Sequence, residues 1–195
     1  MSRHTMIAVR LTLATILLLG VLYPLAMTGL AQALFPKQAN GSLIREGSRV
    51  IGSEIIGQQF TRPEYFHPRP SAAGNGYDAT ASGGSNLGPT SGKLAEGIRG
   101  SALQATAENP GLKSGRIPAD MVMASGSGLD PDITLANAYA QAPRVARARG
   151  IYEGELLRIV NANTTERQFG VLGERRVNVL MLNRALDAIT GVQPK

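Results

Sequence analysis

The sequence predicts an α+β protein in which one N-terminal transmembrane helix is followed by a single small mixed α/β extracytoplasmic domain. Three observations support this fold class. An uncharged apolar run covers residues 11–35. The rest of the chain, residues 36–195, alternates short β-branched runs with segments of helical periodicity. A length of 195 residues leaves room for one domain beyond the helix.

The apolar run 11–35 is long enough to cross a bilayer. As a helix it would extend about 37 Å at about 1.5 Å per residue, against a hydrocarbon core of about 30 Å. Pro24 is tolerated in a membrane helix and can kink it. Because the preceding tail is short and the following domain is long, we predict a cytoplasmic N-terminus (1–10), a transmembrane helix (11–35) and an extracytoplasmic domain (36–195).

A cleaved signal peptide is the alternative interpretation of the same run. Arg3 and Arg10 provide a basic start, and Ala31-Gln32-Ala33 has the small-x-small pattern of a cleavage site. Cleavage after Ala33 would release a secreted binding protein. The run is longer than the roughly 7–15 residues of a signal-peptide core, which favours a permanent anchor.

The first part of the domain is predicted to contain little regular structure. Residues 48–60 combine β-branched residues with Gly52 and Gly57, a pattern that favours strand–turn–strand. Residues 61–92 are rich in Gly, Pro and Ser and predict a loop. So long a loop is unusual in a compact domain, and we expect it to be either disordered or held by a partner or ligand.

A helix is expected over residues 93–111. Leu94, Ile98 and Leu103 could share one face, and Asn109-Pro110-Gly111 would end the helix. A short strand, Met121–Ala124, is expected to follow.

The segment 125–150 begins with small, flexible residues and is predicted to continue as a helix. Asp130 is a good N-cap residue, and Pro131 suits the first helical position because its missing N–H costs nothing there. Pro143 is expected to kink this helix or to begin a second one. Gly150 can supply a left-handed stop.

Two further helices are predicted towards the C-terminus. Tyr152, Leu156, Ile159 and Val160 fall at i, i+4, i+7 and i+8, which indicates a helix with one buried face. The segment 176–190 predicts a short strand that runs into a last helix.

Composition excludes several kinds of site. With no Cys and two His, the chain lacks the ligands for thiolate or histidine-based metal sites, so no metal is expected. The 20 Lys and Arg exceed the 14 Asp and Glu, but five Tyr, four Phe and no Trp supply too few aromatics for a base-stacking surface. The excess of basic over acidic residues is therefore expected to favour contact with anionic membrane lipid and not with nucleic acid.

Two glycine-rich stretches approach catalytic motifs without matching them. GPTSGKL (88–94) has three residues between its glycines where a P-loop has four, and Leu94 stands where Ser or Thr would hold magnesium. ASGSG (124–128) places Ser125 where a nucleophile elbow needs its first Gly. His67 is the only histidine of the domain and lies in a proline-rich loop. We therefore expect no catalytic residue and no directly bound cofactor.

Nine short motifs, in this order and at this spacing, resemble the C subunit of the bacterial Kdp potassium-transporting ATPase over nearly the whole chain. Several of them are ordinary alone, and only the combination is specific. The motifs are YP (23–24), QANGSLI (38–44), IIGQQF (55–60), YFHPRPSA (65–72), YD (77–78), ASGGSN (81–86), ASGSGLDPDIT (124–134), PRVARARG (143–150) and VNVLMLNRALD (177–187).

The resemblance implies a non-catalytic accessory subunit of an ATP-driven potassium uptake complex. Its partners would be a channel-like subunit that selects potassium, a P-type ATPase subunit that hydrolyses ATP, and a small membrane subunit. The family role is to stabilise the assembly and to act as a catalytic chaperone that promotes ATP binding and turnover. ATP is thus implied through the ATPase subunit, and potassium is the transported ion.

The resemblance also implies a location. The chain would lie in the bacterial inner membrane as a single-pass protein, with its N-terminus in the cytoplasm and its domain in the periplasm. Shielding the potassium entrance of the channel-like subunit would suit a domain in that position.

The corner SGSGLDPDIT (125–134), with RPSA (69–72) and SGGSN (82–86), is where we expect contact with the channel-like subunit. Arg69 and Asp78 could pair with each other or bind a partner. The candidate contact residues are Arg69, Ser71, Tyr77, Asp78, Ser82, Gly83, Gly84, Ser85, Asn86, Ser125, Ser127 and Asp130.

Overall fold

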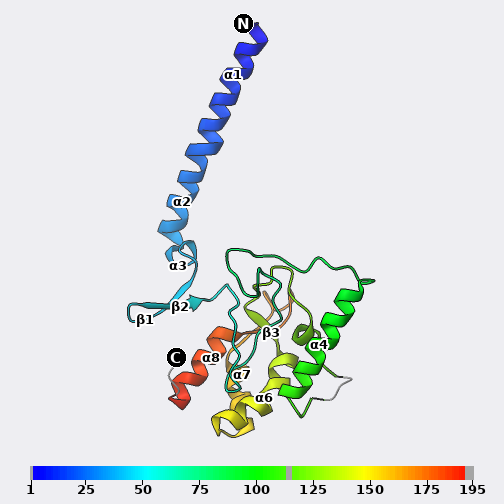
Figure 1. Cartoon of the computed structure of the whole chain (residues 1–195). Coiled ribbons are helices and arrows are strands. Elements are labelled where there is room, and N and C mark those ends of the chain that lie inside the picture. The colour runs from blue at the N-terminus through cyan, green and yellow to red at the C-terminus, as the bar shows by residue number, and fades with distance from the viewer. Residues whose placement is uncertain (1, 113–115, 192–195) are drawn as a thin grey trace. The chain divides into compact units, whose positions relative to one another are not determined.

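The computed structural model describes residues 2–112 and 116–191 (Figure 1). The chain divides into two compact units, Met1–Ile51 and Gly52–Lys195, and each is described by itself. The first unit contains the long apolar helix, and the second combines helices with a small sheet. This mixed α/β content agrees with the predicted fold class.

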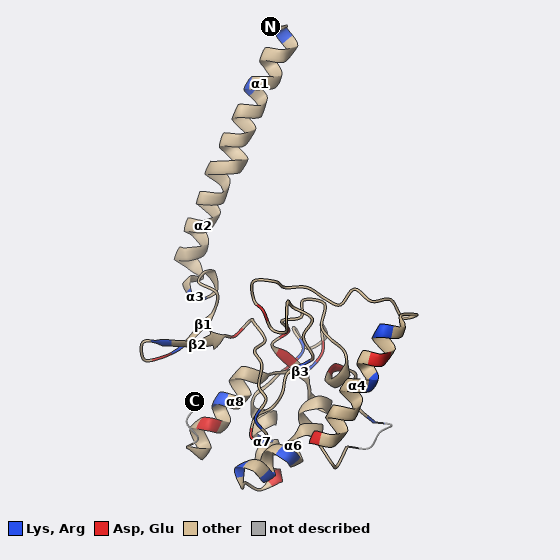
Figure 2. Ribbon diagram, viewed as in Figure 1, with Lys and Arg blue, Asp and Glu red and all other residues tan. Residues whose placement is uncertain are grey.

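One long helix dominates the first unit. It consists of α1 (Arg3–Thr15), a π-helical stretch η1 (Ile16–Leu22) and α2 (Tyr23–Leu34), which follow one another without a break. The whole segment Arg3–Leu34 is long and apolar enough to cross a membrane, and its most apolar part is not buried. Its charged residues lie near its N-terminal end (Figure 2). These properties fit a membrane-spanning segment.

The helix starts earlier than the predicted residue 11 because Ser2 caps it. The Ser2 side chain accepts a hydrogen bond from the Thr5 N–H at 3.2 Å. Pro24 does not interrupt the helix. Proline lacks an N–H and crowds the carbonyl one turn back, and the wider π-helical turns directly before Pro24 accommodate it, with the Tyr23 N–H donating to the Leu18 carbonyl.

A hairpin follows α3 (Pro36–Ala39). Its strands, β1 (Leu43–Glu46) and β2 (Arg49–Ser53), form a two-stranded sheet. The strand–turn–strand prediction for residues 48–60 is therefore wrong, since only its first part is a strand. The turn lies instead at Gly47, whose φ of +58° is a left-handed backbone conformation that glycine adopts cheaply.

The sheet of the second unit has three short antiparallel strands. Their order is β3 (Asp132–Thr134), β5 (Arg176–Asn178) and β4 (Thr164–Thr165). Ile133 lies opposite Val177 in the register, and both side chains are almost fully buried. The centre of this sheet is therefore part of the hydrophobic core.

Three helices supply the rest of that core: α6 (Leu135–Arg149), α7 (Glu153–Ala162) and α8 (Val179–Thr190). Burial of each large apolar side chain stabilises the fold by about 1.5–3 kcal/mol. The principal helical contributors are Val145, Leu156, Val160, Leu182 and Leu186, and Phe66 from the loop joins them.

The predicted helix 93–111 is confirmed as α4 (Gly92–Glu108), which Ser91 caps and which ends at Asn109. The predicted shared face is wrong, because Leu94 and Ile98 are partly buried while Leu103 lies on the opposite side of the helix and is 73% exposed. The predicted strand Met121–Ala124 is wrong, because the chain forms the single-turn helix α5 (Ala119–Val122). Within that turn, the buried Asp120 carboxylate accepts hydrogen bonds from the backbone N–H of Thr134 at 2.7 Å and from its hydroxyl at 3.1 Å. This contact between residues 14 positions apart fixes the turn, and the local sequence around Asp120 does not predict it.

The predicted cap of the next helix is also wrong. Thr134, and not Asp130, is the N-cap of α6, and it accepts a hydrogen bond from the Asn137 N–H at 3.1 Å. Residues 132–134 instead pair with β5, which holds them in an extended backbone. Pro143 begins no second helix, since α6 continues through it, and Gly150 ends α6 with φ +67° as predicted.

The last two helices are close to the prediction. Leu156 and Val160 are buried in α7, but Tyr152 is 79% exposed because it precedes the helix as its N-cap residue. The strand-to-helix prediction for 176–190 is confirmed by β5 and α8.

Candidate functional site

Two segments far apart in the sequence, 69–86 and 125–130, lie against each other in the second unit. We call this place the glycine corner. Ser82 Oγ donates to the Ser127 carbonyl at 3.0 Å, and the Gly83 N–H donates to the same oxygen at 2.8 Å. The three motifs selected from the sequence are thus brought together. That they contact another protein stays a prediction.

Ser71 is the centre of the hydrogen bonds in the corner. Its hydroxyl donates to the Gly128 carbonyl at 2.6 Å and accepts from the N–H groups of Tyr77 at 2.8 Å and Ala73 at 3.2 Å. The Tyr77 hydroxyl donates to the Arg69 carbonyl at 2.6 Å. Burial raises the pKa of Tyr77 to about 12, so the phenol keeps its proton and remains a donor at neutral pH.

Close backbone approach explains why small residues gather here. Gly128 has φ +69°, and a Cβ atom on it would lie 2.6 Å from the Ala73 nitrogen and 2.7 Å from the Gly83 carbonyl oxygen. A Cβ on Gly84 would lie 2.9 Å from the Gly126 carbonyl oxygen. From the sequence we expected the long loop to be either disordered or held by a partner or ligand. Instead, hydrogen bonds within the chain hold it against residues 127 and 128.

Arg69 pairs with Asp130 and not with Asp78. Arg69 Nη1 lies 2.9 Å from Asp130 Oδ2, while Asp130 Oδ1 accepts from the Asp132 N–H at 3.0 Å. Asp78 instead accepts hydrogen bonds from the Thr80 hydroxyl at 2.6 Å and the Thr80 N–H at 2.8 Å, which lower the pKa of Asp78. Asp130, which we predicted to cap a helix, thus links Arg69 of the loop to the first residue of β3.

The candidate contact residues differ in what they can offer a partner. Arg69, Ser71, Tyr77, Gly83, Gly84 and Asp130 are partly buried and take part in the internal contacts given above or lie within them. Ser125 is buried, and its hydroxyl has no hydrogen-bond partner in the described part of the chain. The side chains open to solvent are those of Asp78, Ser82, Ser85, Asn86 and Ser127.

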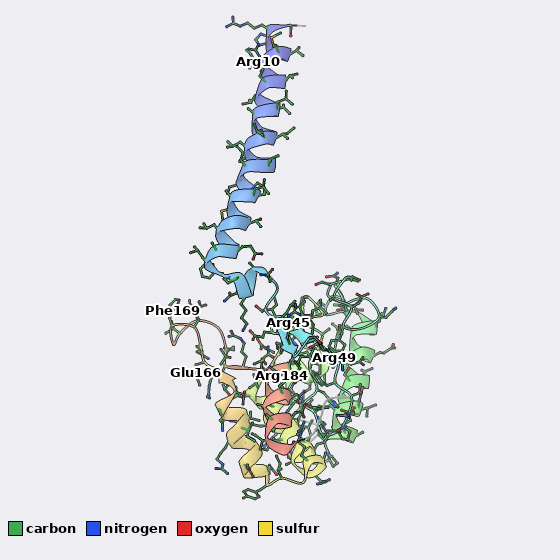
Figure 3. All side chains as sticks on the ribbon, turned by 90° about the vertical axis from the view of Figure 1, so that its left-hand side faces the viewer. Arg10, Arg45, Arg49, Glu166, Phe169 and Arg184 are labelled. Carbon is green, nitrogen blue, oxygen red and sulfur yellow. The ribbon has the colours of Figure 1, made fainter. Side chains whose placement is uncertain are left out.

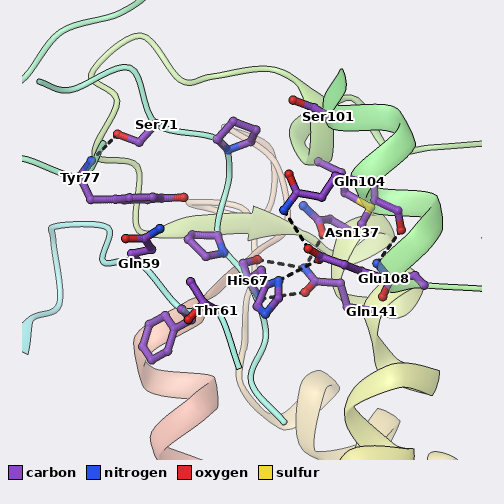
Figure 4. Close-up of a pocket in the computed structure, with 16 residues that line it drawn as sticks. Gln59, Thr61, His67, Ser71, Tyr77, Ser101, Gln104, Glu108, Asn137 and Gln141 are labelled. Carbon is purple, nitrogen blue, oxygen red and sulfur yellow. Dashed lines mark hydrogen bonds and ion pairs between the residues drawn. The ribbon is translucent and has the colours of Figure 1, made fainter. Parts of the chain in front are cut away.

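A pocket of about 270 Å³, which the sequence did not reveal, lies beside the corner (Figure 4). Tyr77 and Ser71 line it on one side, and Gln104 and Glu108 of α4 line it on the other. His67 Nδ1 lies 3.1 Å from Glu108 Oε2 at this pocket. The lining is polar but carries few charges.

Buried amides form the floor of the pocket. Gln141 Nε2 donates to the Asn137 side chain at 2.7 Å and to the His67 carbonyl at 2.9 Å. Asn137 Nδ2 donates in turn to Asp120 Oδ2 at 3.1 Å. Because both of these buried amides have partners, the network fixes the position of the loop against α6. The signal in the sequence was the pair Asn137 and Gln141, spaced i and i+4 on a face of α6 that is otherwise mostly alanine and valine.

The unfolding free energy is expected to fall as the pH drops through about 6.5, the ordinary pKa of histidine. Burial first, and then the charge of Arg144, lower the pKa of His67, and hydrogen bonds to the Arg62 carbonyl and to Glu108 only partly oppose them. Below pH 6.5 the unfolded chain therefore gains a proton that the folded chain resists. The contribution of neutral His67 to the unfolding free energy is fully present above this pH. It is lost as the pH falls towards the lower pKa of His67 in the folded chain.

The measurement is urea unfolding at a series of pH values between 7.5 and 5 for the wild type and His67→Gln. Titrations of carboxyl groups common to both proteins cancel in the difference between them. The wild type should lose more stability than the variant over this interval. Parallel curves for the two proteins would contradict the assignment.

No three His, Asp or Glu side chains approach one another as a metal site requires, within residues 2–112 and 116–191.

Comparison with known proteins gives a consistent result. The model of the family described as "KdpC: K+-transporting ATPase, c chain" matches residues 5–188. A Caulobacter vibrioides protein is 58% identical over 172 residues, which cover 88% of this chain and 86% of that protein. A Gemmatimonas aurantiaca protein is 54% identical over 195 residues, or 100% and 97% of the two chains. A Myxococcus xanthus protein is 55% identical over 188 residues, or 96% and 89%.

Each of these relatives is named "Potassium-transporting ATPase KdpC subunit". The match includes the apolar helix as well as the domain, so the alternative of a secreted binding protein released after Ala33 is not favoured. The resemblance seen in the nine motifs is confirmed, and the chain belongs to the KdpC family of K+-transporting ATPase c chains.

Proposed function

We propose that the chain is a non-catalytic accessory subunit of a Kdp-type potassium-transporting ATPase. The observation that carries this proposal is the family match over residues 5–188, which takes in both the helix and the domain. Its partners are a channel-like subunit, a P-type ATPase subunit and a small membrane subunit. The apolar helix anchors the chain in the membrane, with the N-terminus in the cytoplasm and the domain in the periplasm.

The role of the domain follows from that orientation. The bilayer would separate it from a cytoplasmic nucleotide, so it acts on ATP binding and turnover through the assembly and not by direct contact. Stabilising the complex in an active arrangement is enough to raise the ATP affinity of the ATPase subunit, because binding sites can be coupled through a shared conformational equilibrium. This is the sense in which we propose a catalytic chaperone.

The glycine corner is the proposed contact with the channel-like subunit, near the potassium entrance. Its internal hydrogen bonds hold the loop in one shape, and its exposed candidate contact residues are small and polar: Asp78, Ser82, Ser85, Asn86 and Ser127. A surface of this kind suits close approach to another polar surface, with little ordering cost on binding.

Purification of the tagged full-length chain from membranes tests the proposal. We expect the P-type ATPase subunit and the channel-like subunit to co-purify with it in constant proportion. Removal of the chain should abolish potassium-stimulated ATP hydrolysis or raise the KM for ATP, and its return should restore activity. Recovery of the chain alone, with ATP hydrolysis unchanged by its loss, would contradict the proposal.

The absence of Cys makes the orientation testable in intact cells stripped of their outer envelope. Ser85→Cys and Ser2→Cys each introduce one exposed thiol. A membrane-impermeant maleimide added to intact spheroplasts should label position 85 and leave position 2 unlabelled until the membrane is opened. The reverse pattern would place the domain in the cytoplasm.

A further inference from the structure

A loop with an apolar tip extends from the sheet of the second unit. It is the loop that connects β4 to β5, residues 166–175, which we call the 166–175 hairpin. At its tip Phe169 is 85% exposed, Val171 71% and Leu172 58%. Figure 3 shows Phe169 and Glu166 on this loop, which projects away from the packed side chains of the domain. Three large apolar side chains so exposed within four residues need an explanation, whereas a single one does not.

The 166–175 hairpin is held in shape by hydrogen bonds and ion pairs between its own residues. The Gln168 N–H donates to the Leu172 carbonyl at 2.8 Å, and the Leu172 N–H donates back at 2.9 Å. Below this closure the stem carries two ion pairs across the hairpin, Arg167 with Glu174 at 3.0 Å and Arg175 with Glu166 at 2.8 Å. The tip between the pairs, residues 168–173, has no charge.

Phe169 adopts an unfavourable backbone conformation at this tip. Its φ is +54°, a region that glycine and asparagine tolerate and that is strained for an aromatic residue. Its ring gains nothing from the domain in return, because it is exposed. If the ring were buried in a surface outside the chain, that burial would offset both the backbone strain and the cost of exposing the ring to water.

We propose that the 166–175 hairpin docks into another protein subunit of the potassium-transporting complex. The receiving surface would be an apolar pocket for Phe169, flanked by basic or N–H groups that face Glu166 and Glu174. The inference rests on the proposed function, because it takes the chain to be a subunit of that complex. It adds a second docking surface, apolar where the glycine corner is polar.

The charges of the stem favour a protein over lipid as the occupant. The two Arg and two Glu side chains cancel, and the acids are the more exposed, at 82% for Glu174 and 67% for Glu166 against 45% for Arg167 and 50% for Arg175. Loops that enter anionic lipid usually carry unpaired Lys or Arg and interfacial Trp or Tyr. The hairpin has neither, and its exposed carboxylates would be repelled by such a surface.

A photo-crosslinking amino acid, benzoylphenylalanine, tests the occupant in the intact complex. It is placed at Phe169 or, as the matched control, at Tyr152, an aromatic residue 79% exposed elsewhere on the unit. Irradiation at position 169 should give an adduct with one other subunit, and position 152 should not. Adducts only with lipid or with a second copy of this chain, or no more adduct than at position 152, would overturn the inference.

A pair of substitutions to asparagine separates docking from folding. Phe169→Asn keeps a residue that tolerates positive φ but removes the ring, and it should leave the unfolding temperature unchanged or higher. The recovery of the other subunits with the tagged variant should fall at least about tenfold, the effect of losing an interface hot spot. Tyr152→Asn should leave recovery unchanged, and equal recovery with both variants would overturn the inference.

The wild-type chain provides the reference that separates the two proposals. If the wild type recovers no other subunit, both the proposed function and the docking surface fail. If it recovers the complex while the position-169 adduct is absent, only the docking surface fails.

Discussion

Replacement of Asp187 by alanine is expected to lower the free energy of unfolding by about 3 kcal/mol, the loss that follows when one partner of a buried ion pair is removed. Its partner, Arg149, has a side chain that is 0% exposed, and Asp187 is 13% exposed. Arg149 Nη2 lies 2.8 Å from Asp187 Oδ1. The variant would leave a guanidinium charge in the interior with no counter-charge.

The surroundings of Arg149 explain why the residue cannot easily move to solvent. Its Nε donates to the Glu64 carbonyl at 2.7 Å, and its Nη1 donates to the Thr190 hydroxyl at 2.7 Å. The guanidinium carbon lies 5.1 Å from the centre of the Tyr65 ring, within cation–π range. One side chain therefore joins the loop that precedes the glycine corner to the end of α8, and both attachments depend on the charge remaining in place.

Urea unfolding of the full-length chain in detergent, followed by circular dichroism, measures the effect. Glu174→Ala is the matched control, because it breaks an ion pair at the surface and should cost less than about 1 kcal/mol. Arg149→Met combined with Asp187→Leu should recover part of the stability lost in Asp187→Ala, since no unpaired charge remains. Equal stability of Asp187→Ala and Glu174→Ala would show that the burial of the pair is unimportant.

Local signals were sufficient for much of the fold. The apolar run predicted the long helix, the Asn-Pro-Gly stop predicted the end of α4, and Gly150 predicted the end of α6. In each case the cause lies within a few residues of its effect, such as the left-handed φ at Gly150. The helical periodicity of Leu156 and Val160 likewise reflects burial on one face, which the sequence records directly.

The errors arose where distant contacts decided the local backbone. Asp130 is followed by a strand because residues 132–134 pair with β5, more than forty positions later in the chain. Asp120 sits in a helical turn because Thr134 donates to it. Propensity contains no information on such partners, so Asp130 was predicted as the N-cap of α6 in place of Thr134.

The candidate site shows the same division. The three motifs of the glycine corner were selected together and do lie together, but the reason is backbone approach that only the folded chain reveals. The pocket beside His67 and the exposed Phe169 were missed. Buried amides on a helix and an aromatic residue in a turn both have ordinary structural interpretations, and only their exposure and partners distinguish them.

The substitution Gly128→Ala is expected to destabilise the glycine corner by about 2–5 kcal/mol. Two costs add. The φ of +69° is unfavourable for alanine by about 1–2 kcal/mol, and the new Cβ would lie 2.6 Å from the Ala73 nitrogen and 2.7 Å from the Gly83 carbonyl oxygen. Both neighbours are backbone atoms, which cannot rotate away, so the added methyl must push the loop off the 125–130 segment at a cost typical of overpacking, about 1–3 kcal/mol.

Two other glycines separate these costs. Gly126→Ala has free space and no positive φ, so its unfolding free energy should stay within about 0.5 kcal/mol of the wild type. Gly76→Ala has free space but φ +106°, so it should show the conformational cost alone. Limited proteolysis should cut residues 74–90 faster in Gly128→Ala than in either control, because the bonds from Ser71, Ser82 and Gly83 to residues 127 and 128 would be lost. If Gly128→Ala resembles Gly76→Ala in both measurements, the close backbone contact does not hold the loop, and the ordered surface proposed for the partner would need another source of order.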